Sequence, residues 1–186
     1  FFYIFREYNQ LTTAKANFHE NDQNVEGYAC GLVEALTVSV RALILGNSKK
    51  EQPAPSFLGK HVAVLMPQTD LQFAADLLRV TVRELSRVSE QAGRQQVLEA
   101  LHVTPGVYDR DKLFWGPIQA FVGMDRPIVI STGFRTWRYI QGRGERPGPF
   151  NRIDGLLHQT LTRATFGVII VEPSARTWAA HWEFRA

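Results

Sequence analysis

The five histidines are the first side chains to consider for metal binding or proton transfer, because imidazole serves both purposes near neutral pH. They are scattered along the chain, with no pair at the spacing of metal ligands: His19, His61, His102, His158 and His181. The chain also lacks a phosphate-binding glycine loop, a zinc-protease helix motif and a nucleophile elbow. We therefore predict that the domain is not an enzyme and binds neither a metal nor a cofactor.

Four aspartates keep an enzymatic alternative open. Asp109, Asp111, Asp125 and Asp154 are candidate acids for a small α/β enzyme that acts on a nucleotide or a phosphoester. Such an enzyme would show turnover and metal dependence. A third interpretation is a protein-interaction module without a ligand, in which an apolar helix only mediates dimers.

The size and composition indicate one compact domain. The chain has 186 residues, of which 45% are hydrophobic, and this is enough for a single sizeable core. The net charge of +3 suits a small anionic ligand but is too low to indicate a duplex nucleic acid partner. Cys30 is the only cysteine, so no internal disulfide can form. We predict a reducing, intracellular compartment and a buried thiol.

The periodicity of apolar residues predicts the elements that must position any site. Residues 24–45 repeat apolar positions every three or four residues, which indicates a long helix. Short apolar runs predict buried strands, and amphipathic stretches predict further helices. The predicted strands are 61–67, 113–115, 118–122, 127–130 and 166–171, with a hairpin between the second and third, and the further helices are 70–101, with a break at Gly93, and 153–161. This order predicts an α/β fold, a single domain with one mainly central sheet flanked by helices.

The aromatic start of the chain, residues 1–5, has two interpretations. These residues are either the last turn of a removed membrane helix, since aromatic side chains favour the membrane interface, or the end of a strand or helix that packs on the domain. We predict that residues 1–23 form a connector and that residues 24–186 form the folded domain. On the first interpretation, the domain is the cytosolic part of a membrane-anchored protein.

Several stretches resemble the cytosolic domain of the STING (stimulator of interferon genes) family, the cyclic-dinucleotide receptors of animals and of bacterial antiphage systems. The start of the long helix, Asn24-Val25-Glu26-Gly27-Tyr28-Ala29, is similar to the family's helix opening. The strand Val62-Ala63-Val64-Leu65-Met66-Pro67 and the closing Val168-Ile169-Ile170-Val171-Glu172-Pro173 resemble the family's first and last strands. The pair Asp109-Arg110 falls where the family has an Asp-Arg on the hairpin that covers the ligand.

The resemblance implies a homodimeric receptor with the long first helix at the dimer interface. One cyclic dinucleotide, such as cyclic di-GMP or cyclic GMP-AMP, would sit between the subunits on the two-fold axis. A ligand with two bases and two phosphates suits this symmetry, because each subunit contributes the same contacts once. Ligand binding would close the dimer, promote higher oligomers and switch an attached effector in innate immune or antiphage signalling.

The resemblance also assigns the ligand-binding residues. Arg110 matches the family's hairpin arginine, unless it is only a solvated turn arginine, and Lys112 sits at a second hairpin contact. The residues expected to touch base, ribose or phosphate follow the fourth strand: Ser131, Thr132, Phe134, Arg135 and Thr136. The family's stacking aromatic falls near Leu36 or Thr37 on the long helix, and neither is aromatic.

A second departure concerns base recognition. Ser131 or Thr132 replaces the acidic residue that reads guanine, and a hydroxyl accepts from the guanine N–H groups more weakly than a carboxylate does. We therefore expect either a different cyclic nucleotide or stacking through other aromatics, for which the candidates are Tyr108, Trp115, Phe134 and Trp137.

Overall fold

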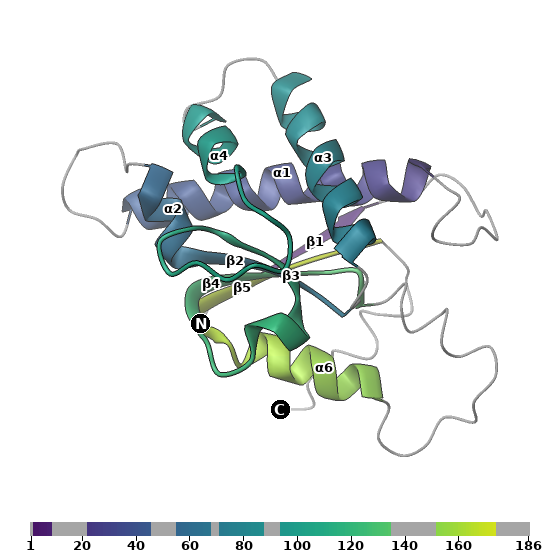
Figure 1. Cartoon of the computed structure of the whole chain (residues 1–186), viewed down its shortest axis with the longest axis vertical. Coiled ribbons are helices and arrows are strands. Elements are labelled where there is room, and N and C mark those ends of the chain that lie inside the picture. Colours follow the sequence, from purple (N-terminus) through teal and green to yellow (C-terminus); the bar gives the residue numbers. More distant parts are fainter. Residues whose placement is uncertain are drawn as a thin grey trace.

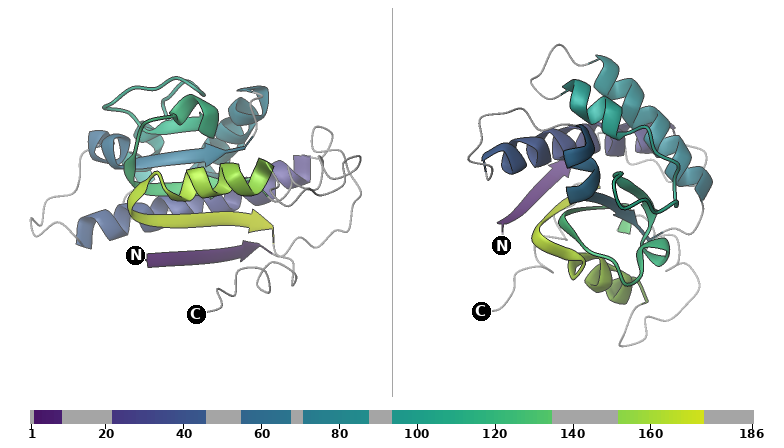
Figure 2. Two further views of the ribbon diagram at one scale, coloured as in Figure 1. Left: turned by 90° about the horizontal axis from the view of Figure 1, so that it is seen from below. Right: turned by 60° about the vertical axis from the view of Figure 1, so that its left-hand side comes forward.

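The sheet at the centre of the molecule is parallel and has five strands. The computed structural model describes residues 2–8, 22–45, 55–67, 71–87, 94–134 and 152–173. The strands are β1 (Phe2–Tyr8), β2 (Val62–Met66), β3 (Phe114–Pro117), β4 (Arg126–Thr132) and β5 (Ala164–Pro173). They lie in the order β1-β5-β4-β2-β3, and every neighbouring pair is parallel (Figure 2). The α/β fold with one central sheet, predicted from the sequence, is confirmed.

Helices cover both faces of this sheet (Figure 1). On one face lie α1 (Asp22–Leu45), α3 (Leu71–Arg87) and α4 (Arg94–Ala100), and on the other lies α6 (Arg152–Leu161). The short helix α2 (Pro55–His61) leads into β2, and the 3-10 helix η1 (Ile118–Phe121) follows β3. This double coverage explains the apolar sequence of the central strands, because all five residues of β2 are buried.

Helix α1 lies between the sheet and α3. Its side chains are described from Tyr28 to Val40, and most of them are buried. The contacts of α1 with α3 on one side and with β5 and β4 on the other account for this burial. Among these side chains Cys30 is exposed, so the prediction of a buried thiol is wrong. α1 therefore packs on two surfaces within the same chain, the sheet and α3, and the dimer interface stays a prediction.

The predicted hairpin of strands 113–115 and 118–122 is wrong. β3 pairs in parallel with β2, and the chain then turns into the 3-10 helix η1. Pro117 has no N–H group with which to continue a strand ladder. In the tight helix that follows, Ile118 and Phe121 fall on the same side because they are three residues apart, and both are buried in the core on the α6 side of the sheet.

The N-terminal segment also differs from the prediction of a connector. Residues 2–8 form β1, which pairs in parallel with β5 from Phe2↔Gly167 to Tyr8↔Pro173. The structure therefore agrees with the second interpretation of the aromatic start, in which these residues form a strand that packs on the domain. The proposed break at Gly93 lies outside the described residues, between α3 and α4. None of the helices in the described ranges combines the length and apolar character needed to cross a membrane.

Candidate functional site

The adjacent strands β2 and β4 send the chain to opposite faces of the sheet. They pair in parallel through Leu65↔Ser131 and its neighbours. After β2 the chain continues into α3, whereas after β4 the ring of Phe134 is buried against Leu157 of α6 on the other face. Parallel α/β sheets bind ligands at the carboxyl ends of strands that diverge in this way. The carboxyl ends of β2 and β4 are therefore the first place to look for a site.

Two buried hydroxyl groups without a partner lie at this carboxyl end. Ser131 and Thr132 are both 0% exposed, and neither Ser131 Oγ nor Thr132 Oγ1 has a hydrogen-bond partner among the described residues. Successive strand residues point to opposite faces, and Ile130 packs on the α1 and α3 side. Thr132 therefore faces the α1 and α3 layer, and Ser131 faces the α6 layer.

The other fully buried hydroxyls of the described core are all satisfied. Ser39, Thr81 and Thr160 each donate to the carbonyl oxygen four residues earlier in their own helix, at 2.8, 2.7 and 2.9 Å. A buried polar group without a partner costs about 1–3 kcal/mol. This contrast distinguishes Ser131 and Thr132, which are 0% exposed and face opposite layers, from the satisfied hydroxyls of the helices.

A glycine with positive φ and one side-chain hydrogen bond shape the backbone at the two strand ends. Gly133 follows Thr132 with a φ of +80°, a conformation that favours glycine. A Cβ atom on Gly133 would lie 3.9 Å from Cδ of Pro67, which is an ordinary contact. Gln119 Nε2 donates to the carbonyl oxygen of Pro67 at 3.3 Å, so η1 holds the end of β2. Backbone conformation, rather than lack of space, therefore requires glycine at residue 133.

A second polar cluster lies at the opposite end of β4. Residues 104–112, called the strap here, connect α4 to β3, and Arg126 at the start of β4 binds them. The Arg126 side chain donates to Tyr108 Oη and to the carbonyl oxygens of Asp109 and Arg110, each at 3.3 Å. Its guanidinium carbon lies 5.2 Å from the ring centroid of Tyr108 and 5.9 Å from that of Phe121. Arg126 is 6% exposed, so the strap covers a buried cation.

The predicted ligand residues consequently fall into two separate groups. Arg110 and Lys112 are exposed on the strap, beside the amino end of β4. Ser131 and Thr132 lie at its carboxyl end, five and six residues after Arg126. At about 3.3 Å per residue, this separation is roughly 16–20 Å. The structure therefore does not bring the two groups together within one chain.

The remaining predicted ligand residues are placed as follows. Leu36 is fully buried in the core, and Thr37 donates its hydroxyl to the carbonyl oxygen of Val33 at 2.8 Å. Phe134 is 1% exposed and packs with Leu157, so its ring is a core contact. Arg135 and Thr136 lie outside the described residues, as does Trp137. Their binding roles stay predictions.

The other two aromatic candidates also have structural contacts. Trp115 is fully buried and donates its indole N–H to the carbonyl oxygen of Ala74 in α3 at 2.9 Å. Tyr108 is 39% exposed and contacts the rings of Phe114 and Phe121 at centroid distances of 6.5 and 6.1 Å. Of the two, only Tyr108 offers an accessible edge for a ligand.

The role of Arg126 was not predicted from the sequence. Arg126 stands at the end of a turn next to Pro127, where an arginine normally points into solvent. Its burial depends on Tyr108, Asp109 and Arg110, which are 16 to 18 residues away in the chain. The one local signal was its position directly before the apolar run 127–130. That signal does not distinguish a buried arginine from an exposed one.

Two of the four candidate acids of the enzymatic alternative, Asp109 and Asp111, make structural contacts on the strap, whereas Asp125 is exposed in the turn before β4 and the side chain of Asp154 lies outside the described ones. Asp109 Oδ1 accepts from the backbone N–H of Asp111 at 2.9 Å, and its Oδ2 lies 3.7 Å from Lys112 Nζ. Asp111 pairs with Lys60 of α2 at 3.1 Å. Within the described ranges, no three His, Cys, Asp or Glu side chains are grouped so that they could hold a metal ion.

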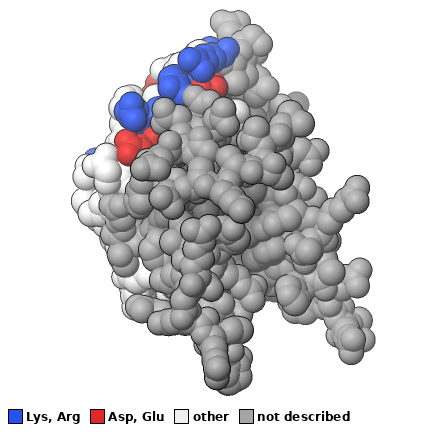
Figure 3. Space-filling view, turned by 90° about the vertical axis from the view of Figure 1, so that its right-hand side faces the viewer, with Lys and Arg blue, Asp and Glu red and all other residues white. Residues whose placement is uncertain are grey.

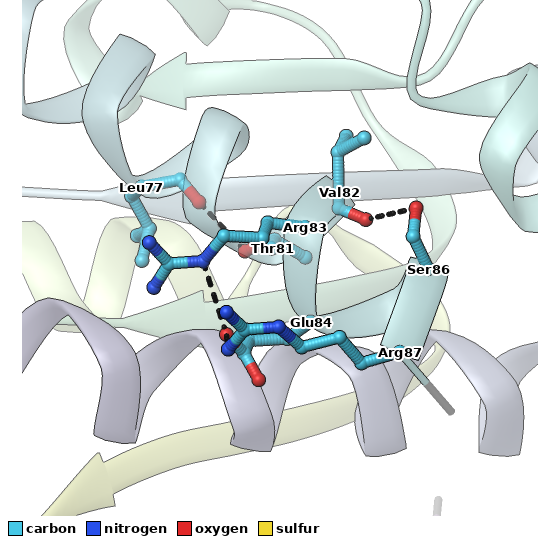
Figure 4. Close-up of polar contacts among 7 residues, drawn as sticks. All are labelled: Leu77, Thr81, Val82, Arg83, Glu84, Ser86 and Arg87. Atoms are coloured by element: carbon cyan, nitrogen blue, oxygen red, sulfur yellow. Dashed lines mark hydrogen bonds and ion pairs between the residues drawn. The ribbon is translucent and has the colours of Figure 1, made fainter. Parts of the chain in front are cut away.

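Charged side chains on α3 mix both signs. Arg83 and Arg87 both bond to Glu84, with N–O distances of 3.2 and 2.8 Å (Figure 4), and Arg79 pairs with Asp76 at 3.2 Å. The described part of the face drawn in Figure 3 likewise shows basic groups next to acidic ones. The described surface of α3 is therefore not a binding face of one sign.

No family model matches this chain, and neither the curated proteins nor the solved structures contain a match to it.

Proposed function

We propose that this chain is the ligand-binding domain of a cyclic-dinucleotide receptor of the STING type, with the ligand at the carboxyl ends of β2 and β4. The resemblance of the sequence supports the class of ligand. The fold supports the location, since parallel sheets use this end for small phosphate-bearing molecules. The domain would act as a sensor that transmits binding as a conformational change, without chemical conversion of the ligand.

The observation that carries the location is the pair of unpartnered hydroxyls, Ser131 and Thr132. A hydroxyl can both donate and accept, so either one would meet a base edge, a ribose hydroxyl or a phosphate oxygen once the segments that bury it move aside. Ligand binding would supply the hydrogen bonds that the described protein groups do not. These hydroxyls already bear the free-energy cost of burial without a hydrogen bond in the ligand-free fold. Ligand binding would remove that cost, which would strengthen the affinity.

The proposal includes a homodimer with one ligand shared by both copies, because a near two-fold symmetric ligand can accept the same contacts from each. The strap cations do not carry the proposal. Arg110 and Lys112 lie at the other end of β4, so contact with the same ligand would require either the strap to move or the other copy to supply them.

Thermal unfolding with a panel of cyclic dinucleotides and their linear counterparts tests the proposal. A ligand at a hundredfold excess over its Kd stabilises the folded state by about 2.7 kcal/mol, which raises Tm measurably. We expect Thr132→Val and Ser131→Ala to reduce or abolish this rise. Thr160→Val is the matched control, because it removes a buried hydroxyl that is already satisfied within α6.

The outcomes separate the three interpretations. A rise in Tm with cyclic ligands that survives in Thr160→Val and is lost in Thr132→Val supports the receptor. Conversion of the nucleotide, followed by chromatography and dependent on a divalent metal, would support the enzyme instead. Absence of any shift, in protein shown to be folded and dimeric, would favour the interaction module.

A further inference from the structure

We infer that Arg126 is a positioning residue that latches the strap, residues 104–112, against the amino end of β4, and that residues 107–112 of the strap can be released. The released strap would free Arg110 and Lys112 from the end of the molecule where they are now held. This inference goes beyond the proposed function and concerns the ligand-free domain.

The first argument is the kind of acceptor that Arg126 uses. On the strap it bonds to the carbonyl oxygens of Asp109 and Arg110 and to Tyr108 Oη, and it also bonds to the carbonyl oxygen of Asp125 beside it, all at 3.3 Å. Hydrogen bonds to carbonyl oxygens fix the position of the backbone itself, independently of the side chains of Asp109 and Arg110. Arg126 therefore sets the conformation of residues 108–110 directly, and with it the place of the Arg110 side chain.

The second argument is that this contact is only moderately stable. All four acceptors are farther from the guanidinium than the 2.9–3.0 Å typical of N–H···O bonds. Arg126 Nε is buried without a partner, and Arg126 has no carboxylate partner among the residues that the structure describes. A buried cation compensated in this way holds its partner less firmly than an ion pair with short hydrogen bonds would.

The third argument is that the strap has separate attachments at its two halves. Near its start, Gly106 N donates to the carbonyl oxygen of Trp115 at 2.8 Å. Near its end, Asp111 pairs with exposed Lys60, and its backbone lies against Gly59 of α2. Gly106 has a φ of +76°, which suits a hinge between these halves. Loss of the Arg126 contacts would leave residues 107–112 held only by the exposed Lys60–Asp111 pair and the contact with Gly59, while residues before Gly106 stay in place.

Limited proteolysis with trypsin tests the latch, because the strap contains cleavage sites after Arg110 and Lys112, of which the second is not followed by an acidic residue. The rate of cleavage after Lys112 is compared with the rate after Arg79 or Arg83 in α3, each followed by mass spectrometry, in wild type and Arg126→Gln. Arg126 precedes Pro127, where trypsin does not cut, so the variant removes no site. Arg87→Gln is the matched control, since Arg87 is exposed on α3.

We expect cleavage after Lys112 to accelerate about tenfold or more in Arg126→Gln, because proteolysis follows the population of the open segment and several hydrogen bonds to a charged group are lost. Cleavage within α3 should keep its wild-type rate. Guanidinium ion, added to Arg126→Ala at concentrations harmless to the wild type, should restore protection of the strap. A purely structural loss of packing would not respond to this ion.

Two results would overturn the inference. If cleavage in the strap and in α3 rises by the same factor, Arg126 contributes to global stability and is not a latch. If cleavage after Lys112 is unchanged, the strap is held by α2 and β3 alone. Both measurements use the protein without nucleotide, so failure of the proposed ligand leaves this test intact, and failure of the latch leaves the ligand proposal intact.

Discussion

The indole N–H of Trp115 donates to the carbonyl oxygen of Ala74 at 2.9 Å and so joins β3 to the first turns of α3. Both residues are fully buried. The position of α3 over β2 and β3 decides where the chain leaves the carboxyl end of β2. The Trp115–Ala74 contact thus helps to build the candidate site without being part of it.

Trp115→Phe should lower the free energy of unfolding by about 2–4 kcal/mol. The variant loses a buried hydrogen bond and leaves part of the space of the indole empty. Urea denaturation followed by circular dichroism measures the effect. Val122→Ala is the control for loss of apolar volume, because Val122 is 69% exposed and should change stability by less than about 0.5 kcal/mol. An equal loss in both variants would contradict a special role for Trp115.

Thr132→Val should stabilise the ligand-free domain, by about 1–2 kcal/mol. The substitution keeps the side-chain shape and replaces a buried hydroxyl without a protein partner by a methyl group. Thr160→Val should instead destabilise the domain, since that hydroxyl donates to Leu156 O. Urea denaturation of both variants and of the wild type measures whether the free energy of unfolding rises in Thr132→Val and falls in Thr160→Val. Destabilisation by Thr132→Val would mean that its hydroxyl is already satisfied in the ligand-free protein.

Gly133→Ala should destabilise the domain by about 1–2 kcal/mol because of its backbone conformation, with a φ of +80°. Gly155→Ala in α6 should have the opposite sign, a gain of about 0.5–1 kcal/mol, since no atom lies within 4 Å of a Cβ there. Differential scanning calorimetry of both variants gives the comparison. A neutral Gly133→Ala would show that the end of β4 can adjust its backbone freely.

The sequence predicted those elements whose signal is local. Residues 24–45 and the apolar runs at 61–67, 127–130 and 166–171 carry their own periodicity, and each corresponds to an element of the structure. β1 was ambiguous because a short aromatic segment reads equally well as a strand or as a helix end. The 118–122 hairpin strand was wrong because the partner of β3 is β2, which lies about 50 residues earlier and leaves no local trace.

The site could be predicted only in part, for the same physical reason. Ser131 and Thr132 were selected by resemblance, and the structure places them at the carboxyl end of β4 with unpartnered hydroxyls. No local pattern could show that Arg110 and Lys112 lie at the opposite end of that strand. Their position follows from the fold of the strap onto Arg126, a contact between segments that are 16 residues apart in the chain.

The strap also lies against the edge of the sheet, where Gly106 approaches Gly116 of β3 closely. A Cβ atom on Gly116 would lie 2.8 Å from Gly106 N, so the absence of a side chain on Gly116 lets the strap backbone run against β3 there. β3 is the last strand of the sheet, and such edges recruit strands from other molecules. Gly106, whose N–H donates to the carbonyl oxygen of Trp115, covers this edge. Because Gly106 is the hinge and stays on β3 when residues 107–112 are released, opening of the strap would leave this edge protected from strand exchange.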